Sequence, residues 1–160
     1  MLKILKAVHI VGVAMFLGSI FAHIAAGQVP GAADDPPAML FARQAIDLAT
    51  RYVTLPGLAI ALISGALMAA GGYPGLLKRR WLAAHAFAAL IVTAITVTVM
   101  IPAGRQILAA AAAVAGGTGS REAFAAFANR EHIFGALNIV LVLGVIVLGT
   151  VKPRLRQSQQ

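Results

Sequence analysis

The fold is decided by the stretch HIFGALNIVLVLGVIVLGTV, which occupies residues 132–151. It contains no formally charged side chain, and about 20 apolar residues in a helix are enough to cross the hydrocarbon of a bilayer. Three earlier runs are similarly long and almost uncharged in their interiors; they occupy residues 4–27, 52–72 and 81–103. The sequence therefore predicts an all-α, polytopic membrane protein whose four transmembrane helices form an up-down bundle.

The composition agrees with a chain that lies mostly in lipid. Hydrophobic residues make up 60% of the 160 residues and charged residues 11%, with a mean hydropathy of +0.88, whereas a soluble domain is about 25% charged. The sequence contains no cysteine, which excludes disulfides and thiolate metal sites. The net charge of +8 does not indicate nucleic-acid binding, because the charges lie at the ends of apolar runs, where they determine topology. We expect a single domain, residues 1–160.

The distribution of charge predicts the orientation in the membrane. The end of the bundle that holds both termini, here called the inner end, carries eight cations and no acid: Lys3, Lys6, Lys78, Arg79, Arg80, Lys152, Arg154 and Arg156. The outer end carries five cations and five acids: Arg43, Arg51, Arg105, Arg121, Arg130, Asp34, Asp35, Asp47, Glu122 and Glu131. Because Lys and Arg in short loops stay in the cytoplasm, we expect both termini on the cytoplasmic side of a bacterial inner membrane. A cleaved leader is the alternative interpretation of the first run, although its two histidines favour a retained span.

The two outer connections are longer than the inner one and are predicted to be partly helical. In the first, residues 28–51, we expect a short amphipathic helix over Pro37–Thr50. The second, residues 104–131, should extend both flanking helices outward, since its alanine-rich part favours a helix. The glycines at 116, 117 and 119 predict a turn there, and Ser120 is a suitable N-cap for the last helix.

Four histidines carry the chemistry, and each lies in or at the edge of an apolar run. Ionisable residues inside a membrane usually face the interior of a bundle. His9 and His23 are 14 positions apart, so on one helix they share a face, with about 40° between their directions and about 21 Å between their heights. Gly12, Phe16 and Ser19 complete this stripe with the spacing of a helix-packing seam.

The predicted topology sorts the histidines into two level pairs. His85 enters the third span from the inner end and should match the depth of His9, while His132 and His23 should match near the outer end. Haem iron bound by two imidazoles needs such a pair on facing helices, so the pattern predicts one or two b-type haems. Small residues leave space for the ring: Gly12, Ser19, Ala61, Gly65, Ala88, Ala89, Thr96 and Gly135. Cations suited to the propionates lie at the outer rim, Arg51, Arg105 and Arg130, and at the inner rim, Lys78, Arg79 and Arg80.

Each of these features has a simpler interpretation. A histidine at a helix end is often an interfacial residue, and small residues in membranes commonly allow close helix packing. The outer arginines can anchor the interface or pair with the outer acids. Copper binding is a weaker alternative to haem: Met39, Met100, His23 and His132 would be the soft ligands, but they form no motif. No carboxylate lies within a span, so a proton relay of the Asp/Glu type is not supported.

Short motifs in all four runs resemble small bacterial membrane proteins. They are Lys6-Ala7-Val8-His9 with Gly18 and Phe21, then Arg51–Thr54 with Pro56 and Gly65, then Trp81, and finally Val151-Lys152-Pro153. They resemble most an uncharacterised family of predicted integral membrane proteins, and beyond it the copper-resistance D domain and the small membrane-type protoporphyrinogen oxidase. The resemblance to the oxidase implies b-type haem with a ligand at His9.

Two departures from the oxidase pattern bear on activity. The lysine expected soon after the tryptophan of the third helix is absent from residues 82–85, and the basic residue expected late in the first helix is absent around residues 20–22. We therefore expect a haem protein with a redox or electron-transfer role, working with a quinone or a partner protein. The alternatives are a protoporphyrinogen oxidase-like enzyme and a non-catalytic or copper-handling membrane subunit. The seam on the first helix would also suit a homodimer.

Overall fold

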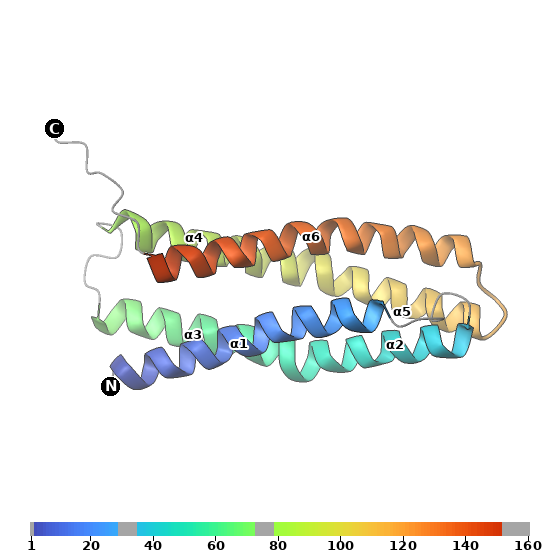
Figure 1. Cartoon of the computed structure of the whole chain (residues 1–160), viewed down its shortest axis with the longest axis horizontal. Coiled ribbons are helices and arrows are strands. Elements are labelled where there is room, and N and C mark those ends of the chain that lie inside the picture. Colours follow the sequence, from blue (N-terminus) through green and yellow to red (C-terminus); the bar gives the residue numbers. More distant parts are fainter. Residues whose placement is uncertain (1, 29–34, 73–78, 152–160) are drawn as a thin grey trace.

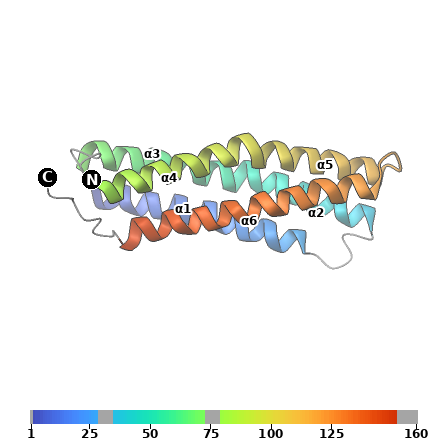
Figure 2. The same ribbon diagram turned by 90° about the horizontal axis from the view of Figure 1, so that it is seen from above.

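The computed structural model describes residues 2–28, 35–72 and 79–151, and within them every regular element is helical. The elements are α1 (Leu2–Gly27), α2 (Pro36–Ala49), η1 (Thr50–Thr54), α3 (Leu55–Gly72), α4 (Arg80–Ile95), η3 (Thr96–Met100), α5 (Ile101–Ala115) and α6 (Arg121–Val151). The π-helical turns η1 and η3 join their neighbours without a break, so the elements form four long rods that lie side by side (Figures 1 and 2).

The four rods confirm the predicted four-helix membrane bundle. They cover Leu2–Gly27, Pro36–Gly71, Arg80–Ala115 and Arg121–Val151, and each is long and apolar enough to cross a membrane. Large apolar side chains such as Ile4, Phe41, Phe87 and Ile133 are exposed on their outer faces, as expected of helices that contact lipid. In a bilayer every backbone polar group must be satisfied within the protein, which helices achieve along their whole length.

The second rod differs from its prediction. A separate short helix was expected over Pro37–Thr50, with the span starting at Tyr52; the structure confirms the helix but continues it directly into α3. The join is η1, whose closing bond runs from the N–H of Leu55 to the carbonyl of Thr50. Pro56 explains this geometry, because proline lacks an N–H and its ring collides with the carbonyl four residues earlier. A wider π turn just before the proline relieves that collision without ending the helix.

The third rod also contains a π turn just before a proline. The π turn η3 closes with a bond from the N–H of Ile101 to the carbonyl of Thr96, and Pro102 follows. A threonine thus begins each π turn, six residues before a proline, in both rods. Because a π turn closes its hydrogen bonds over five residues rather than four, the backbone of each rod is wider at this turn.

The outer connection between α5 and α6 forms as predicted. The helices extend outward on both sides of a glycine turn, where Gly117 has a φ of 72°, a conformation that glycine adopts without strain. The hydroxyl of Ser120 accepts a hydrogen bond from the N–H of Ala123 at 3.1 Å. Ser120 is therefore the N-cap of α6, as expected from the sequence.

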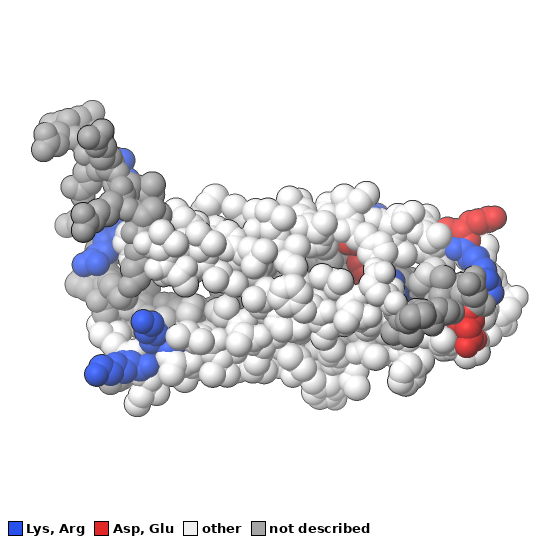
Figure 3. Space-filling model, viewed as in Figure 1, with Lys and Arg blue, Asp and Glu red and all other residues white. Residues whose placement is uncertain are grey.

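Charge separates along the bundle. Leu2 and Val151 lie at the same end, and the described charges there are all basic: Lys3, Lys6, Arg79 and Arg80 (Figures 1 and 3). The described acids all belong to the outer half, together with basic residues (Figure 3). Lys78, Lys152, Arg154, Arg156 and Asp34 lie outside the described residues. The described charges thus follow the pattern on which the predicted orientation rests.

The packing divides the inner half into two hairpins. Helix α1 packs along α3, and α4 packs along α6, while α2 packs on α5 in the outer half. A core layer of Phe16, Leu58, Val92 and Val142 joins the hairpins near the middle of the bundle. The predicted stripe on α1 is confirmed, since Gly12, Phe16 and Ser19 are its buried residues.

The role expected for Gly12 needs correction. A Cβ atom at Gly12 would lie 2.6 Å from the backbone nitrogen of Ala61, and one at Gly57 would lie 2.8 Å from the nitrogen of Phe16. Gly12 therefore brings the backbones of α1 and α3 together and leaves no space for a prosthetic group between these two helices. Small residues commonly serve this purpose in membrane helices.

Candidate functional site

His9 is held in place by the partner helix of its own hairpin. Its Nδ1 lies 2.8 Å from the carbonyl oxygen of Ala61 and 3.2 Å from the hydroxyl of Ser64, both on α3. A carbonyl oxygen can only accept, so Nδ1 carries the proton and donates it. A Cβ atom at Gly65 would lie 3.3 Å from Cε1 of His9, so the ring packs directly on that glycine.

His85 repeats this arrangement in the other hairpin. Its Nδ1 donates to the carbonyl oxygen of Val145 on α6, at 2.9 Å. A Cβ atom at Gly149 would lie 3.0 Å from Cε1 of His85. In both hairpins the accepting carbonyl comes four residues before the glycine, and residues four apart lie one above the other on a helix face. The glycine thus exposes the carbonyl to the imidazole, because it has no side chain to cover it.

The two imidazoles meet between the hairpins. Their ring centroids are 6.5 Å apart, with an angle of 61° between the planes. Because Nδ1 is the donor in each ring, the lone pair of Nε2 is left for another partner. Two imidazoles that hold one metal ion through nitrogens about 2 Å from it have centroids roughly 6 Å apart. The structure therefore brings His9 and His85 together, as the sequence predicted, with a centroid distance close to that value.

His23 and His132 border a cavity in the outer half of the bundle. The cavity has a volume of about 380 Å³ and lies between all four rods. His23 is half-buried, whereas His132 is exposed. The polar side chains of the lining come from every rod: His23, Gln28, Arg43, Asp47, Thr50, Thr54, Thr96, Arg105, Glu131, His132 and Asn138. The outer histidines thus share a cavity, whereas the inner ones share a direct ring contact.

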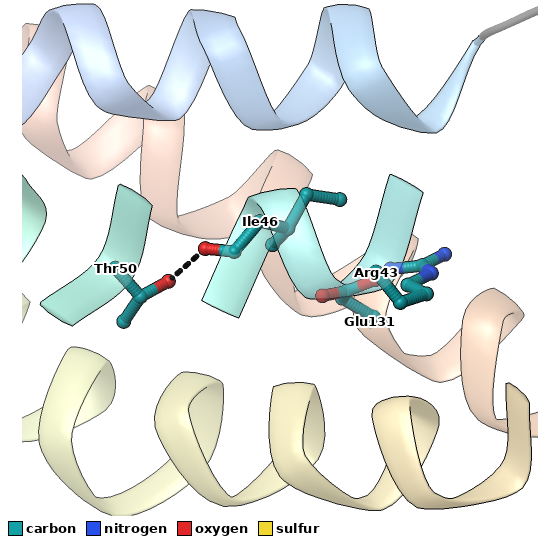
Figure 4. Close-up of polar contacts among 4 residues, drawn as sticks. All are labelled: Arg43, Ile46, Thr50 and Glu131. Atoms are coloured by element: carbon teal, nitrogen blue, oxygen red, sulfur yellow. Dashed lines mark hydrogen bonds and ion pairs between the residues drawn. The ribbon is translucent and has the colours of Figure 1, made fainter. Parts of the chain in front are cut away.

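A buried ion pair crosses the cavity wall. Arg43 on α2 donates from Nη1 to the Oε2 atom of Glu131 on α6, and their side chains are 9% and 17% exposed (Figure 4). The guanidinium of Arg43 also lies 5.5 Å from the ring centroid of Phe124. Breaking a buried pair leaves an uncompensated charge, so this pair fixes α2 against α6. From sequence, Arg43 was taken as an anchor or as the partner of an outer acid; the structure shows the second.

Three polar atoms that line this cavity have no hydrogen-bond partner among the described residues. They are Nε2 of His23, Oγ1 of Thr96 and Oδ1 of Asn138. Thr96 is 4% exposed and Asn138 is 5% exposed. Neighbouring hydroxyls are satisfied: Thr54 donates to Ser19 at 2.9 Å, and Thr50 donates to the carbonyl of Ile46 at 2.8 Å (Figure 4). Buried polar atoms in native proteins nearly always have partners, so each exception requires an explanation.

Asn138, the burial of Arg43 and the choice of Glu131 as its partner were not predicted from the sequence. Asn138 is the one amide side chain in the stretch 132–151, and an amide within so apolar a run was a usable signal. Arg43 lies in the buried stripe of α2 with Met39, Ala42 and Ile46, so the periodicity of that amphipathic helix would have placed it inside. Glu131 precedes His132 directly but was counted only as an outer acid.

The three outer arginines expected at the propionates lie in different surroundings. Arg51 is exposed and pairs with Asp47 at 2.8 Å, as in the simpler interpretation. Arg130 is exposed and lies 5.9 Å from the ring centroid of Phe134. Arg105 is exposed and lines the cavity. Of the three, only Arg105 belongs to the described cavity lining, and propionate binding stays a prediction.

These features define a class of protein, namely a multi-pass membrane protein with polar residues inside a bundle of four helices. The chain belongs to the family of integral membrane proteins described as "Predicted integral membrane protein (DUF2269)", which it matches over residues 3–153. This confirms the resemblance to an uncharacterised membrane family. The further resemblances to the copper-resistance D domain and to protoporphyrinogen oxidase stay predictions. No curated protein and no solved structure matches the chain.

Proposed function

We propose that this protein binds one b-type haem between its two inner histidines and serves in electron transfer within the membrane. The contact between His9 and His85, with ring centroids 6.5 Å apart, carries the proposal. Both rings direct Nδ1 to a backbone carbonyl, which is the support that metal-binding histidines usually have. The resemblance to the oxidase, which implies haem at His9, points the same way.

Haem suits this pair better than a bare metal ion does. Among the described residues no group of three or more His, Asp or Glu side chains could hold a metal ion. Two imidazoles alone supply half of the four ligands that zinc usually takes. A porphyrin would bring four nitrogens of its own, so His9 and His85 could hold its iron without further ligands from the protein.

The chain's own residues would prepare the site for this group. Haem supplies reversible one-electron chemistry when bound. The carbonyls of Ala61 and Val145 would hold the two imidazoles in one tautomer and raise their basicity as ligands. The apolar layer around Phe16 and Val92 lies between the histidine pair and the outer cavity and would keep water from passing along the bundle. Arg79 and Arg80 at the inner end would suit the propionates.

The same proposal includes an orientation. Eight cations without an acid at the inner end, against five cations and five acids at the outer end, favour termini in the cytoplasm. The haem would then lie in the cytoplasmic half of the bilayer of a bacterial inner membrane. Redox partners would approach from that side or through the lipid.

An absorption spectrum of the protein purified in detergent tests the proposal. We expect a Soret band and, after reduction with dithionite, separate α and β bands of a six-coordinate b-type haem. Expression with added haem precursor excludes a shortage of haem in the host. A protein that stays colourless under those conditions, and does not take up haem on titration, would contradict the proposal.

A further inference from the structure

The outer cavity is a second, separate site, and its unpartnered atoms indicate what it binds. Thr96 and Asn138 are at least nine-tenths buried and line the cavity, and neither Oγ1 of Thr96 nor Oδ1 of Asn138 has a hydrogen-bond partner in the part of the chain that the structure describes. They come from different rods, η3 and α6, and the unpartnered Nε2 of His23 comes from α1. A bound molecule that hydrogen-bonds to all three explains the arrangement.

The charges of the lining select an uncharged ligand. Arg43 and Arg105 contribute two positive charges, and Asp47 and Glu131 contribute two negative ones. Arg43 is already paired with Glu131, and Asp47 with Arg51. The remaining charge of the lining belongs to Arg105, which is exposed, so an ion in the buried part of the cavity would have no unpaired charge beside it, and an unpaired buried ion is costly. A neutral molecule meets no such penalty.

The size of the cavity and its apolar walls suit a small ligand whose body is apolar. The volume of about 380 Å³ lies in the range of small-molecule sites, which are mostly apolar with a few polar groups that fix orientation. Phe16, Ile20, Ile24, Ile101 and Ile139 supply the apolar walls. The π turns η1 and η3 contribute Thr50, Thr54, Thr96 and Met100 to the lining, and π turns occur frequently at functional sites.

The unpartnered hydrogen-bonding groups indicate which donors and acceptors the ligand must carry. Oδ1 of Asn138 is an acceptor, so it requires a donor such as a ring hydroxyl, whereas the Thr96 hydroxyl can donate to a ring carbonyl or accept from a hydroxyl. We infer that the outer cavity binds the headgroup of a lipid-soluble quinone or quinol, with its tail toward the bilayer. The carbonyls of a quinone would accept from the Thr96 hydroxyl, whereas the hydroxyls of a quinol would also donate to Oδ1 of Asn138. This site goes beyond the haem proposal and does not depend on it.

Binding of decylubiquinol, the reduced form of a short-tailed quinone, to the purified full chain under anaerobic conditions tests the inference. Equilibrium dialysis against detergent micelles alone gives the amount bound to the protein. We expect saturable binding of one quinol per chain, and about tenfold weaker binding for Asn138→Leu and for Thr96→Val, since each removes one buried hydrogen bond to a ring hydroxyl. Thr98→Val is the matched control: Thr98 is exposed and donates to the carbonyl of Ala94, so its affinity should stay within about twofold of the wild type.

A second variant covers the case in which a polar substitution disturbs folding. A Cβ atom at Gly135 would meet only the Cε atom of Met100, at 3.7 Å, so Gly135→Leu extends into the cavity and should abolish saturable binding. Absence of saturable binding to the wild type, or unchanged affinity in all three cavity variants, would overturn the inference and leave water or lipid as the occupant. A haem spectrum altered by His23→Ala would also overturn it, because haem would then occupy the cavity. The binding measured by dialysis does not depend on whether His9 and His85 bind haem.

Discussion

The two polar regions inside this bundle satisfy their polar atoms in opposite ways. At the inner pair, both imidazoles have their Nδ1 atoms bonded to backbone carbonyls, and each ring packs on a glycine. At the outer cavity, an ion pair closes one wall, while three other polar atoms have no hydrogen-bond partner within residues 2–28, 35–72 and 79–151. The inner region is thus a prepared pair of ligands with a defined geometry. The outer region is a cavity whose walls are held together by an ion pair, and its unpartnered polar atoms would be satisfied by a bound ligand.

The difference shows how a low-dielectric interior separates structural from functional polar groups. An unsatisfied polar atom lowers stability, so a chain retains it only when something else compensates. The satisfied groups, such as Thr54 with Ser19 and Arg43 with Glu131, hold the rods together. Asn138, Thr96 and His23 do not contribute to packing in this way. Substitutions on each side of this division should therefore have opposite effects on stability.

The largest effect is expected from breaking the ion pair of the outer wall. Arg43→Ala leaves Glu131 buried without a partner and should lower the free energy of unfolding by about 3 kcal/mol. The measurement is unfolding in detergent followed by circular dichroism. Arg51→Ala is the matched control, because Arg51 is 61% exposed in its side chain, and an exposed pair contributes less than about 1 kcal/mol. Equal losses in the two variants would show that the Arg43 pair is not the structural element described here.

A smaller effect is expected at the glycine beside the inner pair. Gly149→Ala places a methyl group 3.0 Å from Cε1 of His85, so the ring must move and its bond to Val145 must lengthen. We expect a loss of about 1 to 2 kcal/mol of stability and a weaker affinity for haem, measured by haem titration. Gly144→Ala serves as the control on the same helix, since a Cβ atom there meets nothing within 4 Å. A haem affinity unchanged by Gly149→Ala would contradict the geometry proposed for His85.

The smallest effect has the opposite sign. Asn138→Leu removes an unsatisfied acceptor from the cavity wall and should raise the free energy of unfolding by up to about 1 kcal/mol in the absence of quinone. Thr54→Val removes a satisfied hydroxyl, the donor to Ser19, and should lower the free energy of unfolding by about 1 kcal/mol. Thermal unfolding of both variants in the same detergent measures the difference. A loss of stability in Asn138→Leu would mean that its amide has a structural partner.

The sequence was sufficient for the overall fold because the signal for a membrane helix is long and local. Runs of about 20 apolar residues have few alternatives in a bilayer, and the turn at Gly117 and the cap at Ser120 depend only on neighbouring residues. The continuity of α2 with α3 was missed because Pro56 usually suggests a boundary. A proline can be accommodated either by ending the helix or by a π turn before it, and the sequence does not show which of the two occurs.

The candidate sites were predictable to different degrees for the same reason. His9 and His85 could be paired from depth alone, since the topology fixes the level of each residue along the bundle. The contact between Arg43 and Glu131 joins residues 88 positions apart, and it depends on the rotation of α2 about its axis. The unpartnered atoms of Thr96 and Asn138 depend on the packing of all four rods, which no local pattern contains.

The most direct test of the central claim compares four single variants by the absorption spectrum of the reduced, folded protein and by haem content, which the pyridine haemochrome assay gives. If His9 and His85 are the two ligands, the wild type holds one haem per chain, His9→Ala and His85→Ala lose the six-coordinate spectrum, and His23→Ala and His132→Ala keep both the spectrum and the haem content. Retention of the wild-type spectrum in His9→Ala and His85→Ala, or its loss in the two outer variants alone, would contradict the account.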